Sequence, residues 1–348
     1  MRKSILLIAL LWVSSCLWAW TSPVTVPSVG DARLHIVGQN TENYLMNLEA
    51  SNSSCYDEAD FAAKTNNMAN VFLALEADIV ALCEVEENDE ILGILVNEMN
   101  SLYGQNVYTF ITDGFYVHAS AGSYQQIKAG FIYRTDKVET VGDSYSPYSS
   151  FPYKARMRIQ TFKEKSTGEI FTLSMNHFKA KDSSEDEGES TRIENVTYLL
   201  GELEDITLDP DILVMGDLNA YMGEAPIEAL ENAGFEEQLV RFDPYAYTYI
   251  YRKQKGILDH ALANETMAEQ VTGAYAYHIN TYNYNSSYHY SDHDAVLVGL
   301  KLGKEHPHGE GLWVTGDGQT AVKKIVNGQL VIERNGVLYS VQGFVINN

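Results

Sequence analysis

The chain of 348 residues is long enough for one large domain, or for one domain with an extension. Apolar residues make up 45% of it and prolines number only 8, which favours a packed globular protein. The formal net charge of −23 argues against tight non-specific binding of nucleic acid, because proteins that bind by neutralising phosphates are basic. A metal-dependent enzyme can still act on phosphates, since its bound cation supplies local positive charge.

Residues 1–20 are typical of an export signal. Arg2 and Lys3 precede an apolar stretch, 5–13, that is too short to span a membrane. Two processing sites remain open: cleavage near Ala19, or a lipobox-like Val-Ser-Ser-Cys that would leave a lipid anchor on Cys16. No later segment could span a membrane, so we expect an exported protein, either extracellular or anchored to the bacterial cell envelope.

Apolar patterns predict the elements in chain order. Strands are expected at 34–40, 78–86, 129–134, 157–163, 169–178, 212–215, 257–263 and 294–301. Helices are expected at 58–76, at 90–102, from Thr191 onwards and between Pro226 and Gly234. This α/β (α+β) pattern is too irregular for a doubly wound sheet. It predicts a four-layer sandwich, in which two packed mixed β-sheets are flanked by helices, over 30–302.

The sequence changes character after this domain. Short apolar runs alternate with Asn327-Gly328 and Asn335-Gly336, which are typical hairpin turns, so 309–348 is predicted to be a small C-terminal β extension. Two cysteines remain beyond the export signal. Cys55 and Cys83 could pair in an exported protein, but the apolar strand around Cys83 also suits a buried free thiol.

Polar clusters stand at the ends of the apolar strands. Ser-Asp-His-Asp at 291–294 opens one apolar run, and Gly-Asp-Leu-Asn at 216–219 closes another. Unpaired charge resists burial, so two such clusters predict one shared site. Asp217 and Asn219 are two apart and would share a face of an extended strand, whereas Asp294 continues into the apolar strand and is left out of the site.

These residue types favour particular chemistry. Carboxylate and amide oxygens without a cysteine cluster favour a hard cation, Mg²⁺ first, with Mn²⁺ or Ca²⁺ as alternatives. A histidine beside an aspartate is the usual form of an oriented general base. Together they predict hydrolysis of a phosphate ester. Taken singly, Asn40 could cap a turn, Glu84 could be a surface charge and His177 could lie in the core.

The chain resembles the endonuclease/exonuclease/phosphatase superfamily, which includes the DNase I-like nucleases. The motifs that carry the resemblance span 34–302 in the family's order: GQNTENYL at 38–45, ALCEVEEN at 81–88, KARMRI at 154–159, NHFKAK at 176–181, VMGDLNAY at 214–221, GILDHALAN at 256–264 and SDHDAV at 291–296. NHFKAK and the tyrosine-rich lead into LDHALAN are most similar to secreted bacterial extracellular nucleases. The first motif departs from the family, having Gln39 where an aromatic residue is usual.

The resemblance implies roles for ten residues. Glu84 would be the main metal carboxylate, with Asn40, Glu42 and Asp292 near the metal. The substrate phosphate would be contacted by Arg156 and His177, of which His177 also meets the leaving oxygen. The reaction itself would need Asp217 and Asn219 to position the water and the phosphoryl oxygen, and His293 as general base, oriented by Asp259.

Three functions follow from these expectations. The first is a secreted, monomeric nuclease that degrades extracellular DNA without forming a stable complex with it. The alternative is a phosphatase or phosphodiesterase acting on a small or lipid phosphate, of the inositol phosphate or sphingomyelin type, which suits the acidic surface. A non-catalytic exported binding module is the third, but it would need a broken site, and the site residues are all present.

Overall fold

The computed structural model describes residues 24–114, 119–146, 156–206, 209–282 and 287–303, and four short segments at 311–314, 320–326, 329–334 and 337–340. The expected export signal, with Cys16, and the two Asn-Gly pairs lie outside the described residues. Lipidation and cleavage therefore stay predictions.

Two six-stranded sheets form the centre of the molecule. The first has the order β13-β14-β1-β2-β4-β3, and its strands are Val271–Tyr277, Ala295–Leu300, Leu34–Tyr44, Ile79–Glu86, Ile127–Arg134 and Tyr108–Phe110. The second has the order β5-β6-β7-β8-β12-β9, and its strands are Val138–Tyr145, Arg156–Glu164, Ile170–His177, Ile212–Asp217, Asp259–Asn264 and Phe235–Glu237. Both sheets are mixed, because β1–β2 and β7–β8 are parallel whereas the other pairs are antiparallel.

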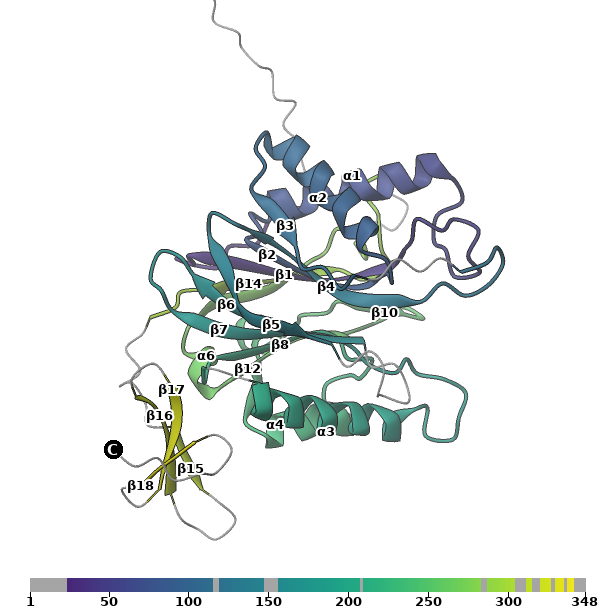
Figure 1. The fold of residues 1–348 in the computed structure, drawn as a ribbon. Helices are drawn as coiled ribbons and strands as arrows, with labels where there is room; N and C mark the ends of the chain where they lie inside the picture. The colour runs from purple at the N-terminus through teal and green to yellow at the C-terminus, as the bar shows by residue number, and fades with distance from the viewer. Residues whose placement is uncertain are drawn as a thin grey trace, which may run out of the picture.

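Helices cover the outer faces of the two sheets (Figure 1). Helices α1 (Glu58–Ala74) and α2 (Asp89–Tyr103) lie on the first sheet, and α3 (Glu189–Ile206) and α4 (Ala225–Asn232) lie on the second. Two short helices, α5 (Gln238–Phe242) and α6 (Glu265–Ala268), connect strands of the second half. The predicted four-layer α/β sandwich is confirmed.

Local signals set the ends of the first two helices. The Asp57 side chain accepts hydrogen bonds from the backbone of Ala59 and Asp60 at the start of α1, and Asn88 caps α2 in the same way. Helix α2 ends at Gly104, whose φ of 78° is the left-handed conformation that glycine adopts without a Cβ clash.

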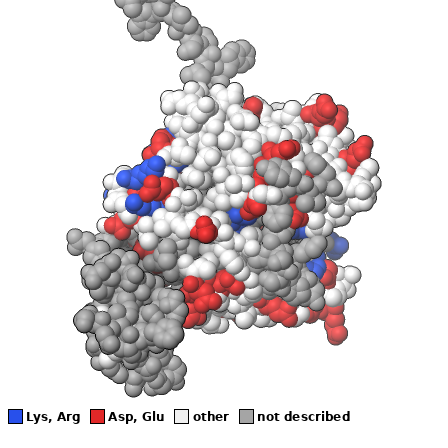
Figure 2. Space-filling view, viewed as in Figure 1, with Lys and Arg blue, Asp and Glu red and all other residues white. Residues whose placement is uncertain are grey.

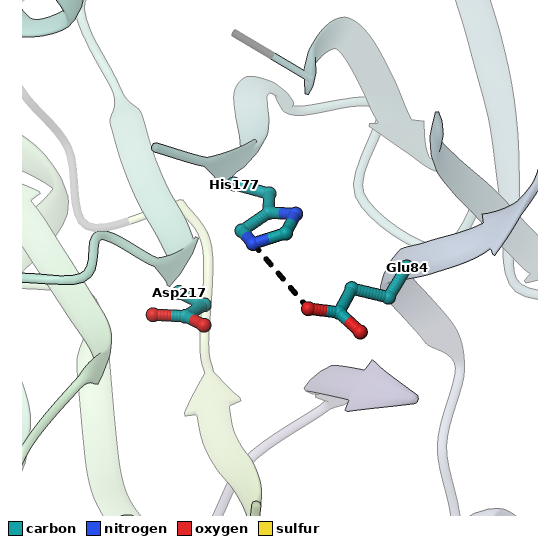
Figure 3. Close-up of side chains that lie close together, drawn as sticks. All are labelled: Glu84, His177 and Asp217. Atoms are coloured by element: carbon teal, nitrogen blue, oxygen red, sulfur yellow. Dashed lines mark ion pairs between the residues drawn. The ribbon is translucent and has the colours of Figure 1, made fainter. Parts of the chain in front are cut away.

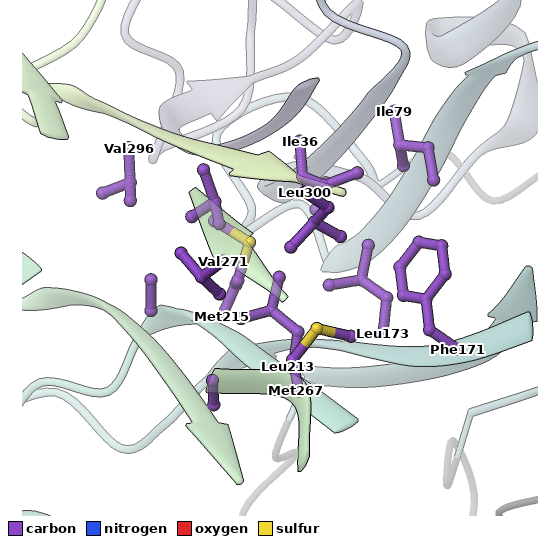
Figure 4. Close-up of a cluster of buried hydrophobic side chains, with 14 of the residues drawn as sticks. Ile36, Ile79, Phe171, Leu173, Leu213, Met215, Met267, Val271, Val296 and Leu300 are labelled. Atoms are coloured by element: carbon purple, nitrogen blue, oxygen red, sulfur yellow. The ribbon is translucent and has the colours of Figure 1, made fainter. Parts of the chain in front are cut away.

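The main core lies between the two sheets (Figure 4). Ile36 and Ile79 of the first sheet face Leu173, Leu213 and Met215 of the second, and all five are buried. The strands read as continuous apolar runs because the helices bury their other faces as well.

Glycine lets the two sheets approach closely beside the polar strand ends. A Cβ added to Gly38 of β1 would lie 2.9 Å from Met215 Cε of β8. Two residues further along each strand, Asn40 and Asp217 lie within hydrogen-bonding distance of each other.

The remaining strands are peripheral. Strands β10 (Tyr249–Tyr251) and β11 (Gln254–Gly256) form a two-stranded hairpin. Strands β15 (Gly311–Val314), β16 (Thr320–Val326), β17 (Gln329–Arg334) and β18 (Val337–Ser340) form a separate antiparallel sheet within the predicted extension. The domain boundaries at 30–302 and 309–348 stay predictions.

Three further expectations concern cysteines, membranes and charge. Cys55 and Cys83 are both buried free thiols, so the alternative of a disulfide is wrong. In the described ranges, no helix is both long and apolar enough to cross a bilayer. Acidic side chains are scattered over the face seen in Figure 2, with few basic side chains among them.

Candidate active site

Strand register places four of the predicted residues in a row at one end of the second sheet. Arg156 pairs with His177 across β6–β7, His177 with Asp217 across β7–β8, and Asp217 with Asp259 across β8–β12. Each stands at the end of its strand that borders the site. The sheet therefore presents a cation, an imidazole and two carboxylates side by side.

Asn40 connects this row to the first sheet. Its Nδ2 donates to Asp217 Oδ2 at 2.9 Å and lies 3.2 Å from Glu84 Oε1. Asn40 Oδ1 accepts a hydrogen bond from the backbone N–H of Glu42 at 2.9 Å. The amide nitrogen thus holds two carboxylates from different sheets close together, while the amide oxygen caps the local turn, so Asn40 has both roles.

Glu84 is turned into the site by an irregularity in β2. The pairing of β2 with β4 shifts between Leu82 and Val85, and Glu84 has a φ of 60°. Irregularities of this kind re-aim a side chain, and a non-glycine residue in this region costs free energy that persists at functional sites. Glu84 Oε2 accepts from the backbone of Asn43 at 3.0 Å.

Glu84 and His177 face each other across the sheets (Figure 3). His177 Nε2 lies 3.4 Å from Glu84 Oε1. Burial acts to raise the pKa of Glu84, but His177 and His293 outweigh it and hold that pKa below its ordinary value. The hydrogen bonds from Asn40 and the Asn43 backbone act with the two histidines, so the contacts of Glu84 favour its carboxylate form. Burial lowers the pKa of His177, and the positive charge of Arg156 lowers it further. The carboxylates of Glu84 and Asp217 act to raise this pKa but do not outweigh burial.

His293 and Asp259 form the expected dyad. His293 Nδ1 lies 2.7 Å from Asp259 Oδ2, and His293 Nε2 lies 3.9 Å from Asp217 Oδ2. Burial opposes protonation of the ring, but Asp259 and Asp217 together raise the pKa of His293 well above its ordinary value. The ring stacks on Tyr249, with 4.5 Å between centroids. The prediction of an aspartate-oriented histidine agrees with this geometry.

Asn219 reaches the site by a different route from the one expected. Strand β8 ends at Asp217, and Asn219 has a φ of 51°, so the two side chains do not share a face of one strand and that argument was wrong. Instead the Asn219 N–H donates to Asp217 Oδ1 at 2.9 Å, and Asn219 Nδ2 lies 3.2 Å from the carbonyl oxygen of Phe178. Burial raises the pKa of Asp217.

Arg156 lies at the end of the row of four residues, and its guanidinium group could bind an anion. Its Nη1 lies 3.5 Å from His177 Nδ1, and its Nη2 lies 3.3 Å from the Tyr124 hydroxyl. Its Nε is buried and has no hydrogen-bond partner among the described residues. A phosphate oxygen could occupy that donor, since guanidinium groups bind phosphates in this way.

Of the predicted metal carboxylates Glu42, Glu84 and Asp292, only Glu84 belongs to a group of described side chains that could hold one ion. Glu84, His177 and Asp217 could hold one ion, and Asp217, Asp259 and His293 form a second such group. Burial raises the pKa of Glu42, and the carboxylates of Asp292 and Glu84 add to the effect. Crowded carboxylates with amide oxygens nearby fit a hard divalent cation, which would relieve their repulsion.

Asp292 stands at the rim of the site. Its side chain is 44% exposed, and Oδ1 lies 3.8 Å from His293 Nε2. This separation is too long for a hydrogen bond, and the exposure leaves the carboxylate accessible to a ligand. Contacts therefore connect Asn40, Glu84, Arg156, His177, Asp217, Asp259 and His293, with Asp292 at the rim, whereas the side chains of Glu42 and Asn219 make no hydrogen bond or ion pair with this group among the described interactions.

Sequence reasoning missed several residues that hold the site together. Ser291 Oγ donates to the carbonyl oxygen of Asn40 at 2.7 Å, and Gln39 Nε2 donates to the carbonyl oxygen of His293 at 3.2 Å. Asp294, which was left out, is fully buried and accepts from His278 Nδ1 at 2.8 Å and from the backbone of Asn280 at 3.0 Å. An acidic residue inside an apolar run was the available signal.

Comparison with known proteins identifies the group. The sequence pattern of the Endonuclease/Exonuclease/phosphatase family matches residues 51–293. The chain belongs to this family. Its members are metal-dependent hydrolases of phosphate ester bonds, so the chain is a hydrolase of this type, as the sequence predicted.

Solved structures support the fold. An endonuclease/exonuclease/phosphatase from Bacteroides vulgatus has a TM-score of 0.56 at 18% identity, covering 78% of this chain and 99% of that one. A mannosyl-6-phosphatase from Bacteroides thetaiotaomicron has a TM-score of 0.55 at 18% identity, covering 77% and 100%. TDP2 of D. rerio, complexed with a single strand DNA product, has a TM-score of 0.52 at 15% identity, covering 77% and 99%. No curated protein sequence matches the chain.

Proposed function

We propose that this family member is an exported, Mg²⁺-dependent nuclease that hydrolyses the phosphodiester bonds of DNA. The observation that carries the proposal is the His293–Asp259 dyad, whose Nε2 lies 3.9 Å from Asp217 Oδ2, a carboxylate that also belongs to the possible ion-binding group with Glu84 and His177. A base on one side of a cation site, with phosphate ligands on the other, suits in-line attack by water on phosphorus.

Different residues of the chain would activate the water, position it and stabilise the charge. In the unprotonated ring, His293 Nε2 takes the proton of the attacking water, and Asp259 accepts from Nδ1–H and so leaves Nε2 free. A cation bound beside Asp217 would oppose the protonation of His293 that the surrounding carboxylates favour. Asp217 and Asn219 position the water and a phosphoryl oxygen. A Mg²⁺ ion held by Glu84, with Asn40, Glu42 and Asp292 beside it, would offset the charge that builds on the phosphoryl oxygens.

His177 and Arg156 bind the phosphate on the opposite side. His177 can donate a hydrogen bond to the phosphoryl or leaving oxygen, and the buried Arg156 Nε is available to another oxygen. Removal of one such group typically costs about 10²–10⁴-fold in rate.

The fold alone does not determine the substrate, because a mannosyl-6-phosphatase and a DNA-bound TDP2 have the same fold. Support for a nuclease comes from the motifs similar to secreted nucleases and from the predicted export signal. A small or lipid phosphate ester is the second candidate, since a net charge of −23 disfavours long polyanions but not small ones.

A panel of substrates and metals tests the proposal. Plasmid, single-stranded DNA, RNA, inositol phosphates and sphingomyelin are each incubated with Mg²⁺, Mn²⁺ or Ca²⁺, with His293→Ala as the blank. We expect wild-type protein to cleave DNA with Mg²⁺. Release of phosphate or phosphocholine with every nucleic acid left intact would replace the nuclease proposal by the second candidate.

Export needs a separate experiment. The full chain is expressed in a bacterial host, and the mature protein in medium and envelope is analysed by mass spectrometry, together with Cys16→Ala. A mature chain that starts at residue 16 with an acyl mass establishes the anchor, and one that starts near residue 20 establishes free secretion. Full-length protein in the cytoplasm refutes export.

A further inference from the structure

A basic, tyrosine-rich hairpin stands directly beside the catalytic dyad. Strands β10 (Tyr249–Tyr251) and β11 (Gln254–Gly256) pair in antiparallel register and are joined by Arg252 and Lys253. The first residue of the hairpin, Tyr249, is the one whose ring stacks on His293. At about 3.4 Å per residue, the tip lies only about 10 Å further along the strand.

The hairpin is fixed to the site through Thr248, which is fully buried. Thr248 Oγ1 accepts from the backbone N–H of Asp259 at 2.9 Å, and the Thr248 carbonyl oxygen accepts from the N–H of Asp294 at 2.9 Å. On its other side, Tyr247 stacks on His278 with 3.9 Å between centroids. The hairpin base is therefore held in a defined position relative to the dyad.

The hairpin carries a local excess of positive charge in an acidic protein. Arg252, Lys253 and Lys255 are all exposed, and no acidic residue occurs from 244 to 258. Within the described part of the chain, none of the three makes an ion pair, whereas Lys181 pairs with Glu224 at 2.7 Å. Two of the cations lie on aromatic rings instead: Arg252 Cζ is 5.1 Å from the Tyr251 centroid and Lys255 Nζ is 3.9 Å from that of Tyr247.

The turn that joins the strands is costly for these residues. Arg252 and Lys253 have φ values of 47° and 70°, the conformation for which two-residue hairpins usually carry Asn-Gly. A non-glycine residue in this region costs of order 1 kcal/mol. Two long basic side chains are thus placed at the tip despite the conformational cost to the backbone.

Tyrosines line the hairpin on the side of the site. Tyr249 and Tyr251 are two residues apart and share one face, and Tyr251 is 51% exposed. Tyr221, three residues beyond Leu218 in the Gly-Asp-Leu-Asn-Ala-Tyr segment, packs across Gly256, where an added Cβ would lie 2.4 Å from Tyr221 Cε1. Glycine at 256 therefore lets Tyr221 extend the tyrosine face.

We propose that the β10–β11 hairpin binds an unpaired nucleic acid strand next to the scissile phosphate. Arg252, Lys253 and Lys255 contact its phosphates, and Tyr251 stacks on a base, as aromatic and basic residues do in single-strand binding sites. An unpaired strand is favoured over a duplex because stacking requires a base that is free of its neighbours. The inference deepens the proposed nuclease function and rests on it.

Binding can be measured without turnover. A fluorescein-labelled twelve-nucleotide single strand is titrated with protein in the His293→Ala background, at two salt concentrations, by fluorescence anisotropy. The test variant is R252S/K253S/K255S. The matched control is K137S/K163S/K165S, which removes the same charge at the far end of β5 and β6. Circular dichroism confirms that both variants fold.

We expect the hairpin variant to bind at least tenfold more weakly and to lower the salt dependence of log K by about 2, since each phosphate contact on a single strand contributes about 0.7. Tyr251→Ala should weaken binding by about tenfold. The control should stay within about twofold of its parent. Equal weakening in hairpin and control variants, or no binding by the parent at low salt, would overturn the inference.

A kinetic comparison separates this inference from the nuclease proposal. In the wild-type background, kcat/KM is measured for the oligonucleotide and for bis(p-nitrophenyl) phosphate, which is too small to reach the tip. The ratio of the two values should fall at least tenfold in R252S/K253S/K255S. If DNA is cleaved and the ratio does not change, the hairpin inference fails while the nuclease proposal survives. If no DNA is cleaved, the nuclease proposal fails, and the binding titration still decides whether the hairpin binds the strand.

Discussion

Replacing Asp259 by asparagine tests whether the dyad works as a unit. The contact between Asp259 Oδ2 and His293 Nδ1 is 2.7 Å, and among neighbouring charges Asp259 raises the pKa of His293 most. An asparagine at this position would keep the shape but lose the charge, and its amide could stabilise the wrong tautomer of the ring. Since the same change in a serine protease triad costs about 10⁴-fold, we expect kcat to fall by about 10²–10⁴-fold.

A double-mutant cycle provides the assay. The kcat for DNA cleavage with Mg²⁺ is measured for Asp259→Asn, His293→Ala and the double variant. If Asp259 acts through His293, adding Asp259→Asn to His293→Ala should cost less than about threefold, because residues that act as a unit are non-additive. Additive losses would refute the reasoning, since they would mean that Asp259 contributes independently.

The chain offers a matched control for this cycle. His260 Nδ1 lies 2.8 Å from Glu237 Oε2, and both groups are buried, but His260 Nε2 is bonded to the Ala220 carbonyl oxygen and not directed at the site. Glu237→Gln should therefore lower stability by about 1–3 kcal/mol in urea denaturation and leave kcat within about threefold. A loss of kcat comparable to that of Asp259→Asn would show that generic damage to a buried pair explains the effect.

Three other predictions follow from the site and the core. Glu84→Gln should lower kcat/KM by about 10²–10⁴-fold, and a Mg²⁺ titration of activity should show weaker saturation; an unchanged Mg²⁺ dependence would contradict its role as a ligand. Asn40→Asp adds a third carboxylate beside Glu84 and Asp217, so its melting temperature should rise more with Mg²⁺ than that of wild type, and an equal rise would argue against a shared ion. Lys128→Met removes a buried cation from Asp89 and Asp113 and should cost about 3–5 kcal/mol in urea denaturation, and a loss below about 1 kcal/mol would contradict the pairing.

The sequence predicted the strands that carry the site because those strands are buried on both faces. Their apolar runs are continuous, and each polar residue that interrupts a run at its end is conspicuous, as with Asp217 and Asp259. The apolar pattern of a single strand does not indicate which strands will be its neighbours in the sheet. The prediction that Asn40, Glu84 and His177 lie beside the dyad therefore depended on the resemblance to a family.

Other features were not accessible from local patterns. The hairpin turn has Arg252-Lys253 where Asn-Gly would have signalled it. Asn219 and Glu84 adopt left-handed conformations that no extended-strand rule anticipates. Asp294 was predicted to be part of the strand. Its buried carboxylate instead accepts hydrogen bonds from His278, Asn280 and Thr281 and so fixes the segment 278–281. In each case tertiary contacts override the local preference.

The Asn40 amide makes the site sensitive to the spacing between the two sheets. Its contacts of 2.9 Å and 3.2 Å join carboxylates that belong to opposite halves of the molecule, and Gly38 and Met215 set how closely those halves approach beside it. A small expansion of the interior would separate the ligands before the protein unfolds. The catalytic rate should therefore depend on the distance between the two sheets. Heat or pressure should inactivate the enzyme before its secondary structure is lost.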